Sequence, residues 1–488
     1  MNVLLSLLQK STDYNQLLKA VEAKQAVAVS GLSQAPRSHV LAAVHEQSGR
    51  PLIAVCQDDM AAKRLASELG AFLGEEPPVL PSRELTLAGA IGVSRQWEQQ
   101  RLRLLYALAQ GRVPVLVASL DALLLRTIPR QTLFSASVTL RVGAEYSMPD
   151  LISRLTRAGY SRASLVEGVG QFALRGGILD VYSPAQEKPL RAEFFGDELD
   201  TMGYFDPITQ RRTENADEAI LLPVAETEPH LHPQGVAGLC GDLRAIITRQ
   251  QRRKTPNQAL IETLQKDCEA LENETLFASA DRYMALIYPE FTTAASYLPQ
   301  EAVVAFCDHG NLQRGEKDRA EEFGLLLDSF LTSGTLFGEL CDYYATIDDL
   351  AASLQGRSVI YCDGFLAARY PESLPPKQLL SFTARQLPGY GGSLETAAAD
   401  LKNYASNQYG SIVLCGGQRR GEILKDLLAK SGLNALLAFP LTKLPQPGQI
   451  LIAGGSLPAG LEYPTLKFAI LTEGQIAVRQ ERKRVRAP

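Results

Sequence analysis

The chain has 488 residues, an apolar fraction of 45% and a formal net charge of −5 at neutral pH. One hydrophobic core stops growing at about 250 to 300 residues, so this length predicts several domains. The negative charge disfavours a protein whose main task is to grip nucleic-acid phosphates, because such domains carry a basic surplus. No run approaches the ~20 apolar residues of a membrane span, and residues 1–10 are too short and too weakly basic for a secretory signal, so we expect a cytoplasmic protein.

The cysteines and histidines show no metal-binding pattern. The seven cysteines are scattered along the chain without a CxxC pair, which predicts reduced thiols inside the cores. His230 and His232 form an HxH motif beside Pro233, but no carboxylate or thiol is patterned around it. The sequence therefore predicts a solvated loop at this motif and no metal site.

Residues 1–139 are predicted to form the first part of a parallel α/β domain. Short apolar, β-prone runs alternate here with segments of helical periodicity, as in a sheet covered by helices. The segments are 26–29, 52–56, 60–73, 97–108 and 113–118. The α/β pattern returns at 226–335, with polar helices around 257–273 and an apolar run at 303–307.

Residues 140–225 are predicted to be a small, largely antiparallel β-rich insert within that domain. Two strand-like runs surround Gly176-Gly177, and a third, 190–195, ends at Gly196-Asp197, so tight turns join the strands.

Residues 336–475 are predicted to form an additional α/β domain. Its expected strands are 358–362, 411–414, 450–453 and 468–471, with helices at 393–404 and 421–430. Residues 476–488 contain the basic run RQERKRVR at 479–486 and are predicted to be a linker, which suggests a fragment cut between two domains.

A degenerate phosphate loop follows the first predicted strand. The loop Gly31-Leu-Ser-Gln-Ala-Pro36-Arg37-Ser38 leads into a helix predicted over 38–45. The Walker A pattern GxxxxGK[ST] needs a second glycine, so that backbone N–H groups wrap the phosphates, and a lysine that reaches the outer phosphates. Pro36 and Arg37 stand at these two positions, and proline has no N–H to donate. We expect no nucleotide here, although Arg37 could still pair with an anion.

The partner motif of such an ATPase is an apolar strand that ends in Asp-Glu and holds Mg²⁺. The candidate is the run 303–307 followed by Asp308 and His309, in which histidine replaces the glutamate. Asp308 is therefore a degenerate position, and a plain strand-end aspartate is the favoured interpretation; Asp363 carries the same ambiguity. No Gly-Lys dipeptide occurs in the chain, so no intact Walker A motif lies elsewhere. The pattern predicts an ATPase scaffold without ATPase chemistry.

The insert is predicted to dock a protein. Residues 145–218 contain 13 acidic and 8 basic side chains, which disfavours DNA as the partner. Because successive side chains of a strand face opposite ways, Arg191 and Phe195 share one face and Phe194 lies on the other. Arg175 lies on a neighbouring run. An exposed arginine and aromatic are typical of interface hot spots.

The alternative for the same residues is structural. Phe195 would then pack inside the insert as well, and the arginines would merely pair with Glu193 or Asp197.

Several motifs resemble the segment that transcription-repair coupling factors, the Mfd family, share with the excision-repair subunit UvrB. The motifs are LPSRE at 80–84, RLRLL at 101–105, VASLDAL at 117–123, EGVGQFALRGGILDVYSP at 167–184, LRAEFFGDELD at 190–200, LPAGLE at 457–462 and TE at 472–473. The resemblance covers nearly the whole chain and is weakest in the middle third. UvrB would carry a long tyrosine-rich hairpin between residues 80 and 101, where this chain has one aromatic, Trp97, so the resemblance favours the coupling factors.

This resemblance implies a fold and a function. The fold would be a degenerate, P-loop NTPase-like (UvrB-like) parallel domain with a β-rich insert, followed by a second α/β domain. The insert would recruit UvrA of nucleotide excision repair, and the matching positions are Arg175, Arg191 and Phe195. RNA polymerase, double-stranded DNA, ATP and Mg²⁺ would be bound by domains beyond Pro488, leaving no cofactor in this chain. The parent would be an ATP-dependent DNA translocase, a helicase-like hydrolase that brings repair to polymerase stalled at DNA damage.

Two alternatives remain open at this point. One is an active UvrB-like DNA-dependent ATPase or helicase, which Pro36 and Arg37 disfavour. The other is a structural clamp that inhibits the downstream motor of the intact protein, a role compatible with docking.

Overall fold

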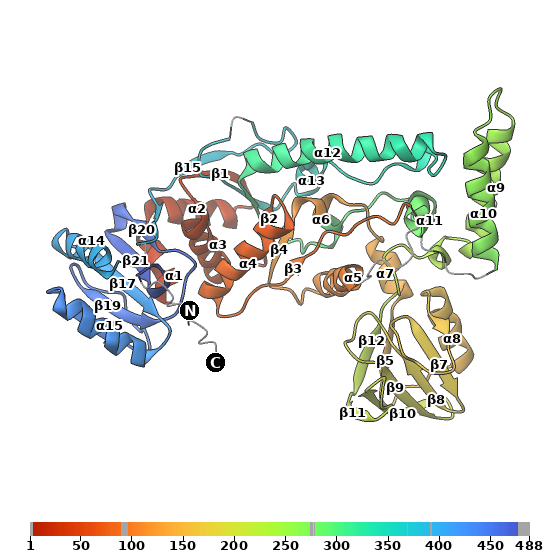
Figure 1. Cartoon of the computed structure of the whole chain (residues 1–488), viewed down its shortest axis with the longest axis horizontal. Helices are drawn as coiled ribbons and strands as arrows, with labels where there is room; N and C mark the ends of the chain where they lie inside the picture. Colours follow the sequence, from red (N-terminus) through yellow and green to blue (C-terminus); the bar gives the residue numbers. More distant parts are fainter. Residues whose placement is uncertain are drawn as a thin grey trace, which may run out of the picture.

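The computed structural model describes residues 3–88, 96–273, 277, 279–367, 369–390 and 393–476. Within them the chain forms an elongated molecule with a central parallel sheet, a second α/β domain at one end and a β-rich insert at the other (Figure 1). A helical hairpin stands beside the insert end. The basic run at 479–486 and residues 477–488 of the predicted linker lie outside the described residues.

The central sheet has seven strands, all parallel, in the order β15-β1-β14-β13-β2-β4-β3. The strands are β1 (Ala26–Ser30), β2 (Leu52–Cys56), β3 (Val79–Leu80), β4 (Val115–Ser119), β13 (Val303–Cys307), β14 (Ser358–Cys362) and β15 (Gln378–Ser381). Every residue of β1, β2, β4, β13 and β14 is buried. Their near-continuous Val, Ile, Leu and Ala runs are those of a sheet covered on both faces, so the predicted parallel α/β domain is confirmed.

Helices cover this sheet and extend from it. They are α1 (Val3–Ser6), α2 (Thr12–Glu22), α3 (Gln34–Ser48), α4 (Asp59–Leu73), α5 (Gln96–Ala109), α6 (Leu120–Leu124), α7 (Arg130–Ala136), α9 (Gly235–Gln251), α10 (Gln258–Glu272), α11 (Met284–Ile287), α12 (His309–Thr332) and α13 (Ile347–Ser353). Local signals set their ends: Asp58 caps α4 by accepting the N–H of Ala61 at 2.7 Å, and Gly74 ends it at φ +89°. No helix among the described residues is long and apolar enough to cross a bilayer.

The insert folds around its own core. Its six-stranded sheet, in the order β11-β10-β9-β8-β7-β6, contains β6 (Ser161–Arg162), β7 (Gln171–Arg175), β8 (Ile178–Val181), β9 (Leu190–Phe195), β10 (Glu198–Phe205) and β11 (Arg212–Asn215). Apart from the short parallel contact of β6 with β7, the pairs are antiparallel. β5 (Val138–Arg141) pairs with β12 (Glu218–Leu221), and these strands pack with α8 (Met148–Arg157) in the same apolar cluster. The predicted antiparallel insert is confirmed.

The second α/β domain begins later than the sequence suggested. The run 358–362 was predicted to belong to it, yet β14 lies between β1 and β13 in the central sheet, and β15 pairs with β1. The predicted boundary at residue 336 is therefore wrong. The second sheet has the order β16-β20-β21-β17-β19-β18. Its elements are β16 (Arg385–Gln386), α14 (Leu394–Ser406), β17 (Gly410–Cys415), α15 (Gln418–Lys430), β18 (Ala435–Ala438), β19 (Ile450–Gly454), β20 (Leu461–Tyr463), β21 (Phe468–Thr472) and α16 (Glu473–Ile476).

The two α/β domains share a hydrophobic core. One apolar cluster contains side chains of α1, α3 and the central sheet together with Ile412, Leu414, Tyr463 and Ile470 of the second domain. In the same interface the buried His39 ring contacts the hydroxyl of Tyr463, at 2.9 Å from Nδ1. Burial lowers the pKa of His39 to about 4, so this contact is made by a neutral ring at physiological pH.

A buried network of charges joins the insert to the central domain. The guanidinium of Arg101 donates to Glu226 at 3.0 and 3.3 Å, at the point where the chain leaves the insert. Arg83 makes a two-pronged bond to Asp281 at 3.0 and 2.9 Å and lies 3.4 Å from Glu226. Burial would raise the pKa of Glu226 and of Asp281, but the neighbouring arginines, Arg101 and Arg83 for Glu226 and Arg83 for Asp281, hold both below their usual range. The carboxylates therefore stay ionised and paired.

Arg101→Ala tests this network. Arg101 is fully buried, so its loss leaves Glu226 with an uncompensated charge, and we expect the free energy of unfolding in urea to fall by about 3–5 kcal/mol. Arg141→Ala is the matched control, because Arg141 makes an exposed pair with Glu218, and it should leave stability almost unchanged. Equal stability of the two variants would contradict the structural role of Arg101.

Candidate functional site

One face of the insert sheet carries two arginines that pair with one buried acid. Asp180 on β8 lies opposite Arg191 on β9, and the Arg191 guanidinium donates to both carboxylate oxygens of Asp180, at 2.7 and 2.9 Å. Arg175 on β7 lies 3.7 Å from the same carboxylate. The Arg191 guanidinium also lies over the ring of Phe205, 4.6 Å from its centre. The hydrogen bond with Asp180 raises the pKa of Arg191 above its ordinary value, so the Arg191 guanidinium stays positively charged.

An aromatic side chain projects from the same face. Phe195, the last residue of β9, is 85% exposed, whereas Phe194 packs inward with its ring edge against Tyr146. The predicted alternation of this strand is confirmed. The structural alternative is wrong for Phe195, and the arginines pair with Asp180 rather than with Glu193 or Asp197.

Two further apolar side chains are exposed on the insert. Ile208 lies in the turn after β10 and is 90% exposed. Ile178 is the first residue of β8, pairs with Arg175 on one side and Glu193 on the other, and is 40% exposed. Sequence analysis missed both. The exposure of Ile208 could have been predicted, because it is an isolated apolar residue in the polar turn DPITQ at 206–210, which offers no core position. We call Arg175, Ile178, Arg191, Phe195 and Ile208 the docking face.

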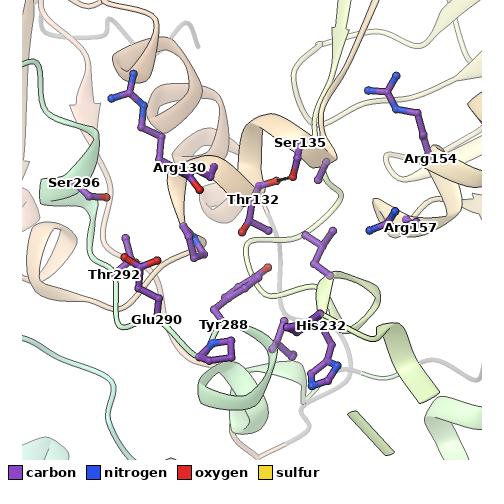
Figure 2. Close-up of a pocket in the computed structure, with 17 residues that line it drawn as sticks. Arg130, Thr132, Ser135, Arg154, Arg157, His232, Tyr288, Glu290, Thr292 and Ser296 are labelled. Carbon is purple, nitrogen blue, oxygen red and sulfur yellow. Dashed lines mark hydrogen bonds between the residues drawn. The ribbon is translucent and has the colours of Figure 1, made fainter. Parts of the chain in front are cut away.

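A cavity separates the insert from the central domain. It has a volume of about 760 Å³ and lies between α7, α8, the turn around His232 and the segment 287–296. Figure 2 shows Arg154 and Arg157 on the insert side and Glu290, Thr292 and Ser296 across from them. Two of the flanking arginines are engaged elsewhere, since Arg130 donates to the carbonyl of Ala109 and Arg154 to that of Ser137. The cavity is thus a polar gap beside the buried network. Tyr288, which lines the cavity, connects the two because its hydroxyl donates to the carbonyl of Glu226.

The HxH motif at this junction differs from the predicted solvated loop. The segment Pro229–Leu231 forms a 3₁₀ turn, and His232 is buried and lies 3.2 Å from a carboxylate oxygen of Asp242. His230 contacts Glu228 at 2.7 Å. Each imidazole therefore has a carboxylate partner within the protein.

The degenerate phosphate loop is shorter than predicted. Helix α3 begins at Gln34 rather than at Ser38, so Pro36 and Arg37 belong to its first turn. Proline fits there because its missing N–H would have no partner in the helix. The predicted eight-residue loop is wrong, and only Gly31, Leu32 and Ser33 connect β1 to the helix.

The groups that would hold a nucleotide are bonded to the protein itself. The N–H groups of Gly31 and Leu32 donate to the carbonyls of Gly364 and Asp363, at 3.1 and 3.3 Å. The Ser38 hydroxyl, at the position that would bind Mg²⁺, donates to the buried carboxylate of Glu68 at 2.5 Å. All three donors are therefore paired with acceptors inside the protein.

The two degenerate motifs also pair with each other. The Arg37 guanidinium donates to Asp308 at 2.6 Å, so the residue replacing the Walker lysine neutralises the strand-end aspartate. Burial alone would lower the pKa of Arg37, but the neighbouring Cys307 and Asp308 raise it above its ordinary value. Asp363 accepts the N–H of His309 at 2.6 Å, and burial raises the pKa of this carboxyl to about 6. All seven cysteines are free, and all but the partly exposed Cys341 are buried.

Comparison with known proteins shows what the insert and the chain are similar to. Residues 138–226 match the family described as the UvrB interaction domain. A transcription-repair-coupling factor of Bacillus subtilis (strain 168) is 23% identical over 489 residues, which cover 98% of this chain and 40% of that protein. A transcription-repair-coupling factor of Staphylococcus aureus (strain USA300) is 25% identical over 497 residues, covering 99% of this chain and 41% of that protein.

Over nearly its whole length the chain is similar to the amino-acid sequences of transcription-repair-coupling factors. It spans about two fifths of the length of these curated relatives. The segment that matches the UvrB interaction domain coincides with the folded insert, from the first residue of β5 to the Glu226 of the buried network. Arg175, Arg191 and Phe195 all lie within it.

Gly31→Ala tests how closely the chain covers the former phosphate loop. Gly31 has φ +80°, and an added Cβ would lie 1.9 Å from the backbone oxygen of Phe382, which cannot move aside like a flexible side chain. Gly49 has φ +66° with open space around it, so Gly49→Ala is the control for backbone strain alone. We expect Gly31→Ala to lower the free energy of unfolding by about 2 kcal/mol more than Gly49→Ala, measured in urea. Equal losses would show that Phe382 does not press on the loop.

Proposed function

We propose that this chain is the amino-terminal adaptor region of a transcription-repair coupling factor and that it docks UvrA through the docking face. The single observation that carries the proposal is Phe195, a large aromatic held in solvent on the sheet face that also carries Arg191 and Arg175, both paired with Asp180. A monomer gains nothing by exposing such a group, whereas interfaces are enriched in aromatic and arginine anchors. The match of this region to the UvrB interaction domain supports a UvrA-type partner.

Preorganisation supports the same proposal. Arg191 is held by two charge-assisted bonds and by the Phe205 ring, so little side-chain entropy remains to be lost when a partner binds. The face as a whole has apolar side chains of Phe195, Ile208 and Ile178 with charges among them. A partner that buries the apolar groups and supplies acids for the arginines would complement it.

The rest of the proposed pathway belongs to the whole protein. By this proposal the parent meets RNA polymerase stalled at a lesion, spends ATP to move along double-stranded DNA, and exposes the docking face so that nucleotide excision repair is recruited. The adaptor role assigned to this chain needs no catalytic group of its own.

We also propose that the chain holds no nucleotide. The Gly31 and Leu32 donors are occupied, and Arg37 and Asp308 neutralise each other. We expect titration calorimetry with ATP and Mg²⁺ to give no saturable heat. The same result is expected for the variant Pro36→Gly with Arg37→Lys, because the backbone bonds of Gly31 and Leu32 remain. Saturable binding by the unaltered chain would contradict this proposal and revive the helicase alternative.

Substitutions on the docking face test the partner. We expect Phe195→Ala and Arg191→Ala each to weaken binding of UvrA by about 2 kcal/mol or more, roughly 30-fold, because truncated hot-spot anchors commonly cost this much. Ile208→Ala should weaken binding as well. Calorimetric titration of UvrA into each variant measures the effect.

Phe365→Ala is the matched control for Phe195→Ala. Phe365 is 91% exposed and lies beyond β14, far along the chain from the insert, so the same truncation should leave UvrA affinity and stability unchanged. Unchanged UvrA affinity for Phe195→Ala and Arg191→Ala would rule out the docking face.

A further inference from the structure

The connection between α9 and α10 is the most concentrated basic segment of the described chain. Residues 244–261 contain five cations and no acid, in a protein whose net charge is −5. Arg252, Arg253 and Lys254 follow one another directly after the end of α9. We call these three residues the basic tip.

A rigid hairpin presents the basic tip. Leu239, Leu243 and Ile246 of α9 and Leu260 and Leu264 of α10 are buried in one apolar cluster with the central domain. Asn257 caps α10 by accepting the N–H of Leu260 at 3.1 Å, directly after the tip. Figure 1 shows the hairpin standing out from the body, with its connecting loop at the outer end. The tip is therefore held away from the rest of the molecule.

The cations of this segment divide into paired and unpaired groups. Arg244 pairs with Glu272, and Arg249 pairs with Glu339 at 3.1 Å while its guanidinium lies over Phe337. Arg252, Arg253 and Lys254 are exposed and form no ion pair with any residue that the structure describes.

The position of the basic tip at the carboxyl end of α9 explains the presence of one cation there, but not of three. Cations near the carboxyl end of a helix interact favourably with its carbonyl groups, which accounts for a basic residue after α9. Three adjacent cations repel one another, however, and that repulsion is relieved when an anionic partner binds. A site of this kind favours a polyanion.

The chemistry of the tip favours a nucleic acid over an acidic protein. Protein interfaces have an apolar centre, and no large apolar side chain is exposed among residues 249–258. A phosphate backbone needs only cations and small polar donors, and Thr255 adds an exposed hydroxyl beside the cations. We propose that the basic tip binds the phosphate backbone of a double-stranded nucleic acid without reading its sequence. The contact is separate from the docking face, so either proposal can fail alone.

The salt dependence of binding tests the tip. Fluorescence anisotropy of the full 488-residue chain with a short labelled DNA duplex, and with an RNA duplex of the same sequence, gives the binding constant over a range of salt concentrations. Each phosphate contact contributes about 0.9 to the slope of log K against log salt, so the variant with Arg252, Arg253 and Lys254 all changed to Ala should lower the slope by about 2–3. Preference for DNA or for RNA would identify the source of the phosphates, and a reduced slope on either supports the proposal.

A second triple variant controls for total charge. Lys402→Ala, Arg419→Ala and Lys430→Ala remove the same charge from exposed positions of the second domain and should leave the slope unchanged. Circular dichroism should show both variants folded, because all six side chains are exposed. The proposal is overturned if the tip variant keeps the slope of the unaltered chain, if the control loses as much, or if the chain binds polyglutamate but neither duplex.

Discussion

The buried pairing of Arg101 with Glu226 is the interaction on which the placement of the insert depends. Arg101 belongs to a helix of the central domain, and Glu226 is the last residue of the matched UvrB interaction domain. Arg101 also donates to the carbonyls of Pro81 and Ala122, so one guanidinium joins three segments of the central domain to the exit of the insert. Because both charges are out of water, neither can be lost without leaving the other uncompensated. An inserted domain is thus attached by directional bonds rather than by apolar contact alone.

The loop that resembles a degenerate phosphate site is a structural junction. In an active ATPase, the carboxyl ends of the central strands would remain open for phosphate and metal. Here the same positions are closed by Arg37 with Asp308, by Ser38 with Glu68, and by the Phe382 backbone over Gly31. Each bond uses a group that a ligand would need, so closing the site strengthens the platform that carries the insert.

Local patterns predicted most of the elements and the exposure of Phe195, but they did not predict which strands pair across long sequence separations. The alternation of a strand sufficed to place Phe195 outward and Phe194 inward, because successive side chains of a strand point to opposite faces of the sheet. The run 358–362 was recognised as a strand but assigned to the wrong sheet, since apolar character does not say which parallel neighbours a strand takes. The early start of α3 was missed because proline was taken as a loop residue although the first helical turn accepts it. The bond of Arg191 to Asp180 needed the register of β8 against β9, which follows only once the hairpins are in place.

The strand order of the central sheet has a consequence for synthesis on the ribosome. β1 is made first, yet both of its sheet neighbours, β14 and β15, lie more than 300 positions downstream. At a translation rate of about 5–20 residues per second, β1 waits on the order of half a minute for the strands that flank it. Throughout that interval its apolar edges have no hydrogen-bonding partners, while the insert, whose core residues lie between 138 and 221, can already be complete. The insert can thus be folded on the nascent chain before the central sheet that supports it closes.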